Sequence, residues 1–388
     1  MLKNIMEKKL RFNSATIHGG QSPDPAYGAV MPPIYQTSTY AQTTPGGHKG
    51  FEYSRTHNPT RQALEKSLAS IENGKHGLAF ASGLAAMDAV MKLLQPGDEV
   101  ISTNDLYGGS YRLFTKIFEG FGLKFHFVGM SDLANVETAI NKNTKLIWVE
   151  TPTNPMMNVV DLAAVAQLAK KNNLHLAVDN TFASPYLQQP LNFGADIVMH
   201  SATKYLAGHS DVVLGSLVVN DDDLHQRLAF IQNASGAVPG PMDSFLTLRG
   251  IKTLHVRLQR HCENGKAVAE YLAAHPKIEK VFWPGFDTHP NHDVAKKQMN
   301  DFGGMLSFIP KGADYKAAIK IVENLKLFTL AESLGGVESL AGHPASMTHA
   351  SIPKEEREKS GVVDALIRLS VGIEDAQDLI DDLAHAIG

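Results

Sequence analysis

The sequence has a single cysteine, and its positive and negative charges are nearly balanced. Cys262 is the only cysteine among 388 residues, so no disulfide can form within the chain and nothing indicates an oxidising compartment. The chain has 36 Lys and Arg against 40 Asp and Glu, a formal net charge of −4. Binding to a nucleic-acid backbone relies on a basic excess, so we expect no nucleic-acid partner.

Long apolar runs are also missing. No stretch approaches the roughly 18 consecutive apolar residues of a membrane span, and residues 1–11 lack the apolar core of a signal peptide. We therefore expect a cytoplasmic protein with no membrane partner.

The sequence lacks the signature motifs of several enzyme classes. No Gly-x-Gly-x-x-Gly opens a helix and no Gly-x4-Gly-Lys-Ser/Thr occurs, which argues against a dinucleotide dehydrogenase and a P-loop enzyme. The 17 histidines contain no His-Glu-x-x-His, and there is no Gly-x-Ser-x-Gly elbow. His289 and His292 are spaced like metal ligands, but they lie in a proline-rich stretch without a third ligand in evidence. We interpret this pair as surface and expect no metal site.

Composition and length indicate a folded chain of several domains. Hydrophobic residues make up 43% and charged residues 20%, as in ordinary globular proteins. At about 150 residues per domain, the length allows two or three domains. Residues 1–57 read as an irregular arm, because turn formers recur there without a helical or strand period. The arm is apolar enough to favour docking against another surface over a disordered tail.

Regular elements begin at residue 58. Asn58 and Pro59 supply the N-cap and first-turn proline of a helix that ends before Gly74. Helical segments, one of them over 110–119, then alternate with short apolar runs at 77–81, 99–102, 123–128, 145–149, 174–178 and 196–199. This alternation predicts an α/β domain with a mainly parallel sheet over residues 58–249. Residues 250–388 predict a smaller α+β domain, with long helices at 254–275 and 375–387 around strands at 280–283, 305–309 and 366–371.

Three segments of the α/β region carry residues of chemical interest. At Gly83 a strand passes into a helix, whose first-turn N–H groups suit a phosphate, although tight packing is an alternative. Asp179 ends an apolar strand, where open α/β sheets bind ligands, or it caps a helix. Lys204 follows another strand, where it could form a Schiff base with a carbonyl cofactor or lie at the surface. Together, in this order, they suit pyridoxal 5′-phosphate (PLP), which needs phosphate donors, a carboxylate for its ring nitrogen and a lysine for its aldehyde.

Longer motifs carry a resemblance to a known family. They are Tyr53-Ser-Arg55-Thr-His-Asn-Pro-Thr60, Ser82-Gly-Leu-Ala-Ala86, Tyr107-Gly-Gly-Ser-Tyr-Arg112, Glu150-Thr-Pro-Thr-Asn-Pro155, Val178-Asp-Asn-Thr-Phe182, Ser201-Ala-Thr-Lys-Tyr205, Glu332-Ser-Leu-Gly-Gly-Val-Glu-Ser339 and Arg368-Leu-Ser-Val-Gly-Ile-Glu-Asp375. With these motifs the chain resembles the cystathionine γ-synthase and γ-lyase group of the Cys/Met-metabolism PLP enzymes. The resemblance implies the aminotransferase-like fold type I, with a mainly parallel large domain and a smaller α+β C-terminal domain.

The resemblance also implies how the cofactor is held. Lys204 would carry PLP as a Schiff base and later move protons, Asp179 would pair with the ring nitrogen, and Tyr107 would stack on the ring and help activate the substrate amine. The expected phosphate ligands are Gly83, Leu84, Ser201 and Thr203, joined by Tyr53 and Arg55 of a neighbouring subunit. The arm would thus complete a neighbour's site, in a homotetramer built from two site-sharing dimers.

On the substrate side, the resemblance implies that Arg368 binds the α-carboxylate through its guanidinium fork. Asn154 and Ser333 would assist there or at the cofactor ring. Positions that face the distal end of the substrate are matched by Glu52, Arg112 and Glu332. Opposite charges there suit a second amino-acid group, such as the cysteinyl end of cystathionine.

Two neighbouring activities are disfavoured by the resemblance. Methionine γ-lyases usually have a cysteine where this chain has Gly109, and bacterial cystathionine β-lyases usually have bulky aromatics near the position of Glu332.

The resemblance implies chemistry at the γ-carbon of an amino acid. We expect a cystathionine γ-synthase, which joins an O-acylhomoserine to L-cysteine, with γ-lyase activity, because segments 107–112 and 332–339 look most like those of bacterial γ-synthases. A dedicated γ-lyase, which turns cystathionine into cysteine, 2-oxobutanoate and ammonia, stays open, and so does the choice of acetyl or succinyl group. A fold-type-I aminotransferase is opposed by the motifs around Tyr107 and Glu332. A non-catalytic PLP-binding regulator would need a lost catalytic group or an added DNA-binding module, and neither is visible.

Overall fold

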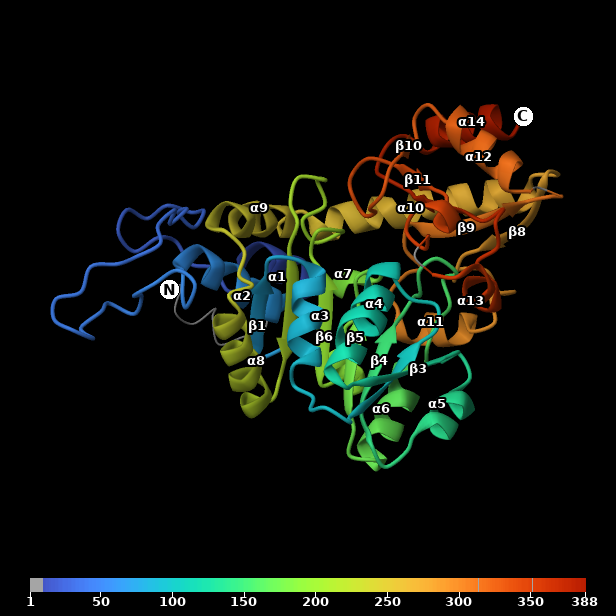
Figure 1. The fold of residues 1–388 in the computed structure, drawn as a ribbon. Helices are drawn as coiled ribbons and strands as arrows, with labels where there is room; N and C mark the ends of the chain where they lie inside the picture. Colours follow the sequence, from blue (N-terminus) through green and yellow to red (C-terminus); the bar gives the residue numbers. More distant parts are fainter. Residues whose placement is uncertain (1–9, 313, 351) are drawn as a thin grey trace.

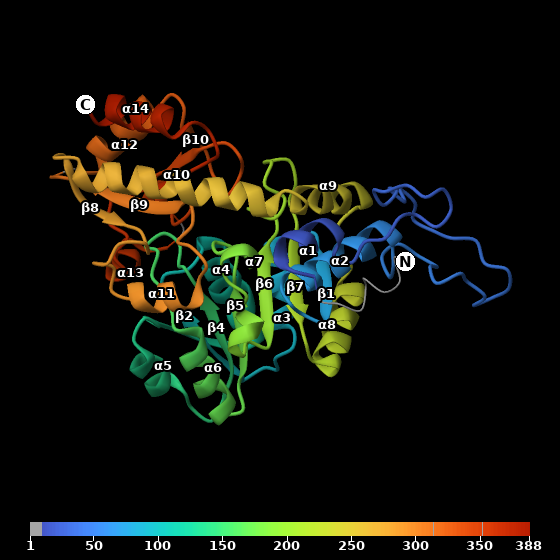
Figure 2. The ribbon, with the colours of Figure 1, turned by 180° about the vertical axis from the view of Figure 1, so that it is seen from behind.

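The chain folds around two β-sheets. The computed structural model describes residues 10–388 except 313 and 351, so the expectation for residues 1–9 lies outside the described residues. The long helix α10 (Leu254–Ala274) runs from the first sheet toward the second, and the N-terminal segment extends away on the opposite side (Figures 1 and 2).

The first sheet is the mainly parallel one. Its strands are β1 (His76–Phe80), β2 (Glu99–Thr103), β3 (Lys124–Val128), β4 (Thr144–Glu150), β5 (His175–Asp179), β6 (Ile197–Ser201) and β7 (Gly215–Val219). They lie in the order β1-β7-β6-β5-β4-β2-β3, parallel from β6 to β3, with β7 antiparallel to β1 and β6. The six predicted strands and their parallel arrangement are confirmed. β7, which was not predicted, runs antiparallel because the connection 202–214 holds no helix to make a parallel crossover.

Helices surround this sheet, and several begin at side-chain caps. They are α2 (Pro59–Ile71), α3 (Gly83–Met91), α4 (Gly108–Arg112), α5 (Leu133–Ala139), α6 (Leu162–Lys171), α7 (Ser184–Leu187), α8 (Asp222–Ser235) and α9 (Pro241–Ile251). The Asn58 side chain accepts N–H bonds at the start of α2, as predicted, and Ser82 and Asp161 do the same for α3 and α6. The helix expected over 110–119 is split, because Leu113–Phe118 continues α4 as a π-helix.

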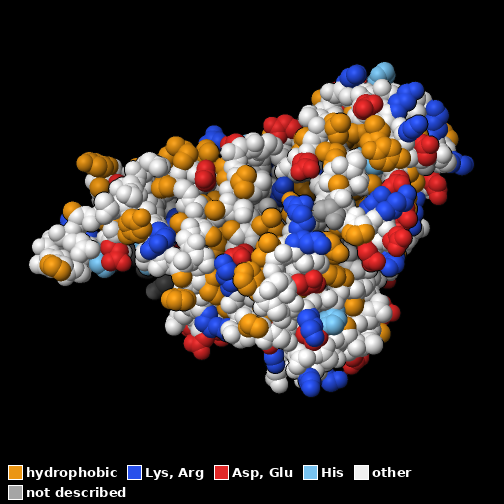
Figure 3. All heavy atoms as spheres, viewed as in Figure 1, with side chains coloured by type: hydrophobic (Ala, Val, Ile, Leu, Met, Phe, Trp, Pro, Cys, Tyr) orange, Lys and Arg blue, Asp and Glu red, His pale blue; other side chains and the backbone are white. Residues whose placement is uncertain are grey.

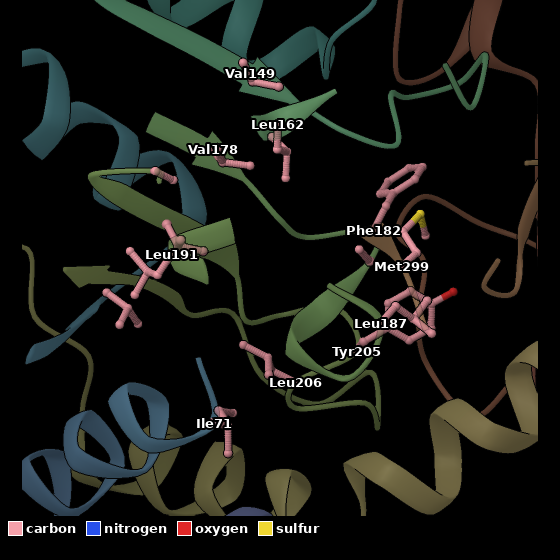
Figure 4. Packing of buried hydrophobic residues seen from close by; sticks show 14 of the residues in the cluster. Ile71, Val149, Leu162, Val178, Phe182, Leu187, Leu191, Tyr205, Leu206 and Met299 are labelled. Carbon is pink, nitrogen blue, oxygen red and sulfur yellow. The ribbon is translucent and has the colours of Figure 1, made fainter. Parts of the chain in front are cut away.

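The inner strands of the first sheet are buried on both faces, whereas the edge strand β3 is only partly buried. Along β4, Ile147 and Val149 belong to one apolar cluster and Leu146 and Trp148 to another, because alternate side chains point to opposite faces. Figure 4 shows part of the first cluster, in which Val149 lies with Val178 of β5 and Leu162 of α6. Burial on both faces explains why these strands read as continuous apolar runs.

The second sheet is mostly antiparallel. Its strands are β8 (Ile278–Phe282), β9 (Met305–Pro310), β10 (Thr329–Leu330), β11 (Leu340–Gly342) and β12 (Ile367–Ser370), in the order β10-β11-β12-β9-β8. The other helices of this region are α11 (His292–Gln298), α12 (Tyr315–Asn324), α13 (Lys354–Lys359) and α14 (Ala376–Ile387). Side chains of α10, α12 and α14 form one core with β9 and β12. No helix in the described part of the chain is long and apolar enough to cross a bilayer.

The N-terminal segment is mostly irregular, as predicted, with one exception. Helix α1 (Phe12–His18) forms ahead of the turn formers that begin at Gly19, and it buries Ala15 and Thr16. Beyond it the arm projects from the body, and Tyr27 and Val30 are 94% and 85% exposed (Figure 1). Apolar side chains are visible on the projecting arm in Figure 3. An exposed apolar segment of this kind is suited to docking.

Candidate active site

A cavity of about 380 Å³ lies where the strands of the first sheet end and the second sheet begins. The carboxyl ends of β4, β5 and β6 and the start of α3 contribute to its wall, and residues of the second sheet region, including Ser333 and Arg368, close it. Open α/β sheets bind ligands at this edge. Its volume falls in the usual range for small-molecule sites.

The start of α3 offers hydrogen-bond donors to an anion. Ser82 caps the helix by accepting the N–H of Ala85 at 3.1 Å, and the N–H groups of Gly83 and Leu84 have no carbonyl to bond within the helix. A Cβ added to Gly83 would lie 2.9 Å from Cβ of Ser201, so only glycine lets these two segments approach so closely. Together with the Ser201 hydroxyl, this end of the cavity fits a phosphate.

Thr203 is less ready to bind a phosphate. Its hydroxyl lies 3.2 Å from the carbonyl oxygen of Leu214, to which it donates, and it accepts the Leu214 N–H at 3.0 Å. The hydroxyl would have to rotate to donate into the cavity.

Asp179 ends β5 with its carboxyl in the cavity wall. Both the N–H and the hydroxyl of Thr181 donate to Oδ1, at 3.0 and 2.5 Å, which leaves Oδ2 available. Burial raises the pKa of this carboxyl, against the bonds from Thr181 and the nearby His200. A cationic ring nitrogen at Oδ2 would offset the cost of that burial.

Lys204 follows β6, and its Nζ donates to Oγ of Ser333 at 2.7 Å. Burial, with a smaller contribution from Arg368, lowers the pKa of the ammonium group to about 8, although Glu332 acts in the opposite direction. Near physiological pH, a larger fraction of the Lys204 amine is therefore neutral and nucleophilic than in a surface lysine. Ser333 has a left-handed backbone, with φ of 102°, which is uncommon for a residue other than glycine.

Arg368 of β12 is buried and is held from two sides. One terminal nitrogen donates to Oδ1 of Asn154 at 2.9 Å and the other to the carbonyl oxygen of Ser333 at 2.9 Å. Burial lowers the pKa of the guanidinium to about 10, so it stays charged at neutral pH. A guanidinium has five N–H donors, so donors remain for a carboxylate in the cavity.

Tyr107 stands at the mouth of the cavity, 39% exposed. Its backbone N–H donates to Oε2 of Glu150 at 3.0 Å. A Cβ added to Gly109 would lie 2.2 Å from Cε1 of the Tyr107 ring, so any side chain at this position would displace the ring. The absence of a side chain at Gly109 therefore allows the observed position of the Tyr107 ring.

The structure brings eleven of the expected site residues to the wall of one cavity: Lys204, Asp179, Tyr107, Gly83, Leu84, Ser201, Thr203, Arg368, Asn154, Ser333 and Glu332. Four others do not line it. Arg112 is exposed on α4, and Glu52, Tyr53 and Arg55 lie in the arm, where the Arg55 guanidinium is 5.6 Å from the Tyr53 ring centre. A single chain therefore leaves the cavity without its expected arm residues.

Sequence reasoning missed several residues of the wall. Glu150, Thr181 and Thr348 line the cavity. Glu150 and Thr181 lie within two of the quoted motifs, at or just after strand ends, so the sequence did indicate them. Thr348 comes from a loop far along the chain and had no such signal. The candidate metal pair is accounted for by structural bonds, because His289 contacts the carbonyl oxygen of Met157 and His292 that of Pro284.

Taken together, the N–H donors at α3, the available oxygen of Asp179 and the Lys204 amine with its lowered pKa fit the phosphate, ring nitrogen and aldehyde of PLP. Each group is supplied by a different strand end, so the fit depends on the sheet as a whole.

Comparison with known proteins agrees with this site. Residues 13–388 match the family described as Cys/Met metabolism PLP-dependent enzyme. The chain is 54% identical to the cystathionine beta-lyase of Coxiella burnetii over 98% of both chains, and 51% identical to the cystathionine gamma-lyase of Dictyostelium discoideum over 97% of both. It is 53% identical to the cystathionine gamma-synthase of Mycobacterium tuberculosis, over 96% of this chain and 95% of that one.

A solved structure, described as metB from Corynebacterium glutamicum, superposes with a TM-score of 0.95 at 49% identity, covering 97% of this chain and 98% of the other. The expected fold, cofactor and enzyme class are confirmed. The chain belongs to the Cys/Met metabolism family of PLP-dependent enzymes.

Proposed function

We propose that this enzyme acts in trans-sulfuration at the γ-carbon of amino acids. It joins an O-acylhomoserine to L-cysteine, giving cystathionine, and also eliminates at the γ-carbon of cystathionine. The observation that carries the proposal is one cavity in which Lys204 lies among the buried carboxyl of Asp179 and the buried guanidinium of Arg368. The names of the Dictyostelium and Mycobacterium relatives, a γ-lyase and a γ-synthase, support the same chemistry.

In this proposal each part of PLP has a partner. The N–H groups of Gly83 and Leu84 and the hydroxyls of Ser201 and Thr203 would hold the phosphate, Asp179 the ring nitrogen and Lys204 the aldehyde carbon. Tyr107 would lie on the ring and help to activate the substrate amine. When bound, PLP draws electrons away from the α-carbon of the substrate, so that protons can leave Cα and then Cβ.

Arg368 would bind the α-carboxylate and set the orientation of the substrate. Its guanidinium plane is already fixed by Asn154 and Ser333, so little freedom is lost when a carboxylate binds. Lys204, displaced by the substrate amine, would take the Cα proton as a general base and return protons as an acid. With the Cα and Cβ protons removed, the γ-substituent can leave. Addition of the cysteine thiol then gives cystathionine, and release without addition gives 2-oxobutanoate and ammonia.

The distal end of the substrate would meet charges of both signs. Glu332 lines the cavity, and its negative charge raises the pKa of both Lys204 and Arg368. Arg112 and Glu52 would supplement it, Glu52 from the arm of a neighbouring subunit. Such a set suits a substrate that ends in a second amino-acid group.

A homotetramer of site-sharing dimers is part of the proposal. The projecting arm, with Tyr53 45% exposed, supports it, because Tyr53 and Arg55 do not reach the cavity of their own chain. Docked on a second copy, the arm would bring its basic and aromatic side chains to the phosphate end of that copy's cavity.

A second candidate activity rests on the Coxiella relative, which is named a cystathionine beta-lyase. Cleavage at the β-carbon of cystathionine gives pyruvate and homocysteine instead of 2-oxobutanoate and cysteine. The sequence around Glu332 lacks the bulky aromatics expected of that activity.

Two assays of the purified holoenzyme test the proposal. Cystathionine alone should yield 2-oxobutanoate in excess of pyruvate, and an O-acylhomoserine with L-cysteine should yield cystathionine. Running acetyl and succinyl esters in parallel identifies the preferred acyl group. Pyruvate as the main keto acid would assign the β-lyase activity, and turnover of neither substrate would contradict the proposed function.

A further inference from the structure

Glu150 is a buried carboxyl in the cavity wall that has no role in the proposed reaction. It is the last residue of β4 and pairs in register with Asp179, the last residue of the parallel neighbour β5. Register partners on adjacent parallel strands point to the same face of the sheet, so the two carboxyls share one side of the cavity wall. Both are nearly inaccessible, at 4% and 7% exposure.

Glu150 connects two other parts of the site. Its Oε2 accepts the backbone N–H of Tyr107 at 3.0 Å, at the start of α4. The backbone N–H of Asn154 also lies near this carboxyl and favours its charged form, and the Asn154 side chain holds Arg368. A single side chain therefore fastens Tyr107 to the strand end beside Asp179, next to the segment that holds Arg368.

The charges around Glu150 oppose its ionisation. Burial has the largest effect on the pKa of Glu150, and the facing carboxyls of Asp179 from β5 and Asp105 from the connection after β2 raise it further. The pKa of Glu150 therefore lies well above its usual range. The N–H groups of Tyr107 and Asn154 act the other way, and Arg368 of β12 is a cation that faces it. Two adjacent buried carboxyls cannot both ionise at low cost. Asp179 has two bonds from Thr181 and the field of His200, and PLP would bring its cationic ring nitrogen to Asp179.

We infer that Glu150 is a positioning residue: as an uncharged acid it holds Tyr107 in place and leaves Asp179 as the negative charge beside the cofactor ring. The inference rests on the proposed function for its catalytic consequence only. The state of Glu150 itself can be measured on the PLP-loaded protein without turnover.

Infrared spectroscopy of the holoenzyme tests the charge state. The wild type should show the carbonyl stretch of a protonated carboxylic acid that Glu150→Gln loses. Glu99→Gln is the matched control, because Glu99 is a buried carboxyl at the other end of the same sheet whose pKa its hydrogen bonds with His126 and Asn141 lower to about 2. This control should keep the band. A wild-type spectrum in which Glu150→Gln removes no such band would overturn the inference.

The positioning role is tested by comparing Glu150→Gln with Glu150→Ala. Glutamine keeps an oxygen acceptor for Tyr107, so the visible circular dichroism of the bound cofactor, which reports its fixed orientation, should stay close to that of the wild type. Alanine should weaken this signal and lower kcat by about 10- to 100-fold, the usual consequence of a small misplacement. If Glu150→Ala keeps both signal and kcat, Glu150 positions nothing. If Glu150→Ala does not fold, Glu150→Asp, whose shorter side chain does not reach the Tyr107 N–H, replaces it in the same comparison of circular dichroism and kcat. Failure of turnover in a wild type that binds PLP would contradict the proposed function and leave the inference on Glu150 intact.

Discussion

Lys204 is the side chain whose properties depend most on its surroundings. Its Nζ sits in a cavity largely shielded from water, donates to Ser333 and lies in the field of Arg368, and all of this follows from positions far apart in the sequence. A lysine after a strand is common, and its chemistry here comes from burial.

We predict that Lys204→Ala abolishes both turnover and the visible absorbance of lysine-bound PLP. The amine that joins the cofactor aldehyde is then absent. Lys252→Ala is the matched control, since Lys252 is also partly buried and has a lowered pKa but donates to the backbone of Ile17 away from the cavity. Absorbance spectra and the cystathionine assay are the measurements. A Lys204→Ala protein that is still coloured and active would refute the assignment.

The pKa of Lys204 predicts the pH dependence of cofactor uptake. Only the neutral amine attacks an aldehyde, so the rate at which the apoenzyme combines with PLP should rise with pH and level off above about 8, where most of the amine is neutral. A lysine with the ordinary pKa of 10.5 would show a rate that still climbs at pH 10. Stopped-flow absorbance across this range separates the two outcomes.

Helix α2 begins after Asn58, whose side chain both caps the helix and bonds to the arm. Oδ1 of Asn58 accepts the N–H of Thr60 at 2.9 Å and of Arg61 at 3.3 Å, while its Nδ2 donates to the carbonyl oxygen of Tyr35 at 2.9 Å. The first pair of bonds is what the sequence motif predicts. The bond to Tyr35 fastens the root of the arm to the helix.

We predict that Asn58→Ala lowers the free energy of unfolding by about 1–2 kcal/mol, since it removes a cap in a buried position. Asn58→Asp should keep most of the capping energy, because a carboxylate accepts the same bonds, but it loses the bond to Tyr35. Thermal unfolding at fixed protein and PLP concentration is the measurement, because ligand binding also shifts the midpoint. Equal stability of Asn58→Ala and wild type would show that the cap contributes nothing.

At the level of the assembly, the proposed docking of the arm would divide the site residues of one chain between two active sites. The chain division into an arm at 1–57, a PLP domain at 58–249 and a C-terminal domain at 250–388 stays a prediction, as does the tetramer. The cavity nevertheless draws on both sheets, because Arg368 and Ser333 close what the ends of β4, β5 and β6 begin.

We predict that subunits with Lys204→Ala and subunits with Arg55→Ala, each of low activity, regain activity when mixed. In a hybrid dimer one site contains an intact Lys204 and an intact Arg55, so random mixing should restore about a quarter of the sites. Activity after joint unfolding and refolding is the measurement, with each variant refolded alone as its control. No gain on mixing would mean that Arg55 serves the site of its own chain or none.

Local sequence signals were enough to predict most of the helices and strands. Caps, apolar runs and turn formers depend on neighbours in the chain, so α2 and the parallel strands were placed within a few residues. Helix α1 was missed because it is stabilised by packing on distant segments more than by a pattern of its own. Strand β7 was missed although Leu217, Val218 and Val219 form a short apolar run. The π-helical continuation of α4 likewise has no signature in the periodicity of residues 110–119.

The identity of the cofactor, and most of the residues proposed to hold it, follow from the sequence, because the motifs lie at strand ends, and the strand ends of a parallel sheet meet at one edge. Their chemical state does not follow from it. The lowered pKa of Lys204, the two-sided clamp on Arg368 and the role inferred for Glu150 arise where β4, β5, β6 and β12 converge and exclude water. Burial and the field of neighbouring charges are properties of that convergence, which no single segment contains.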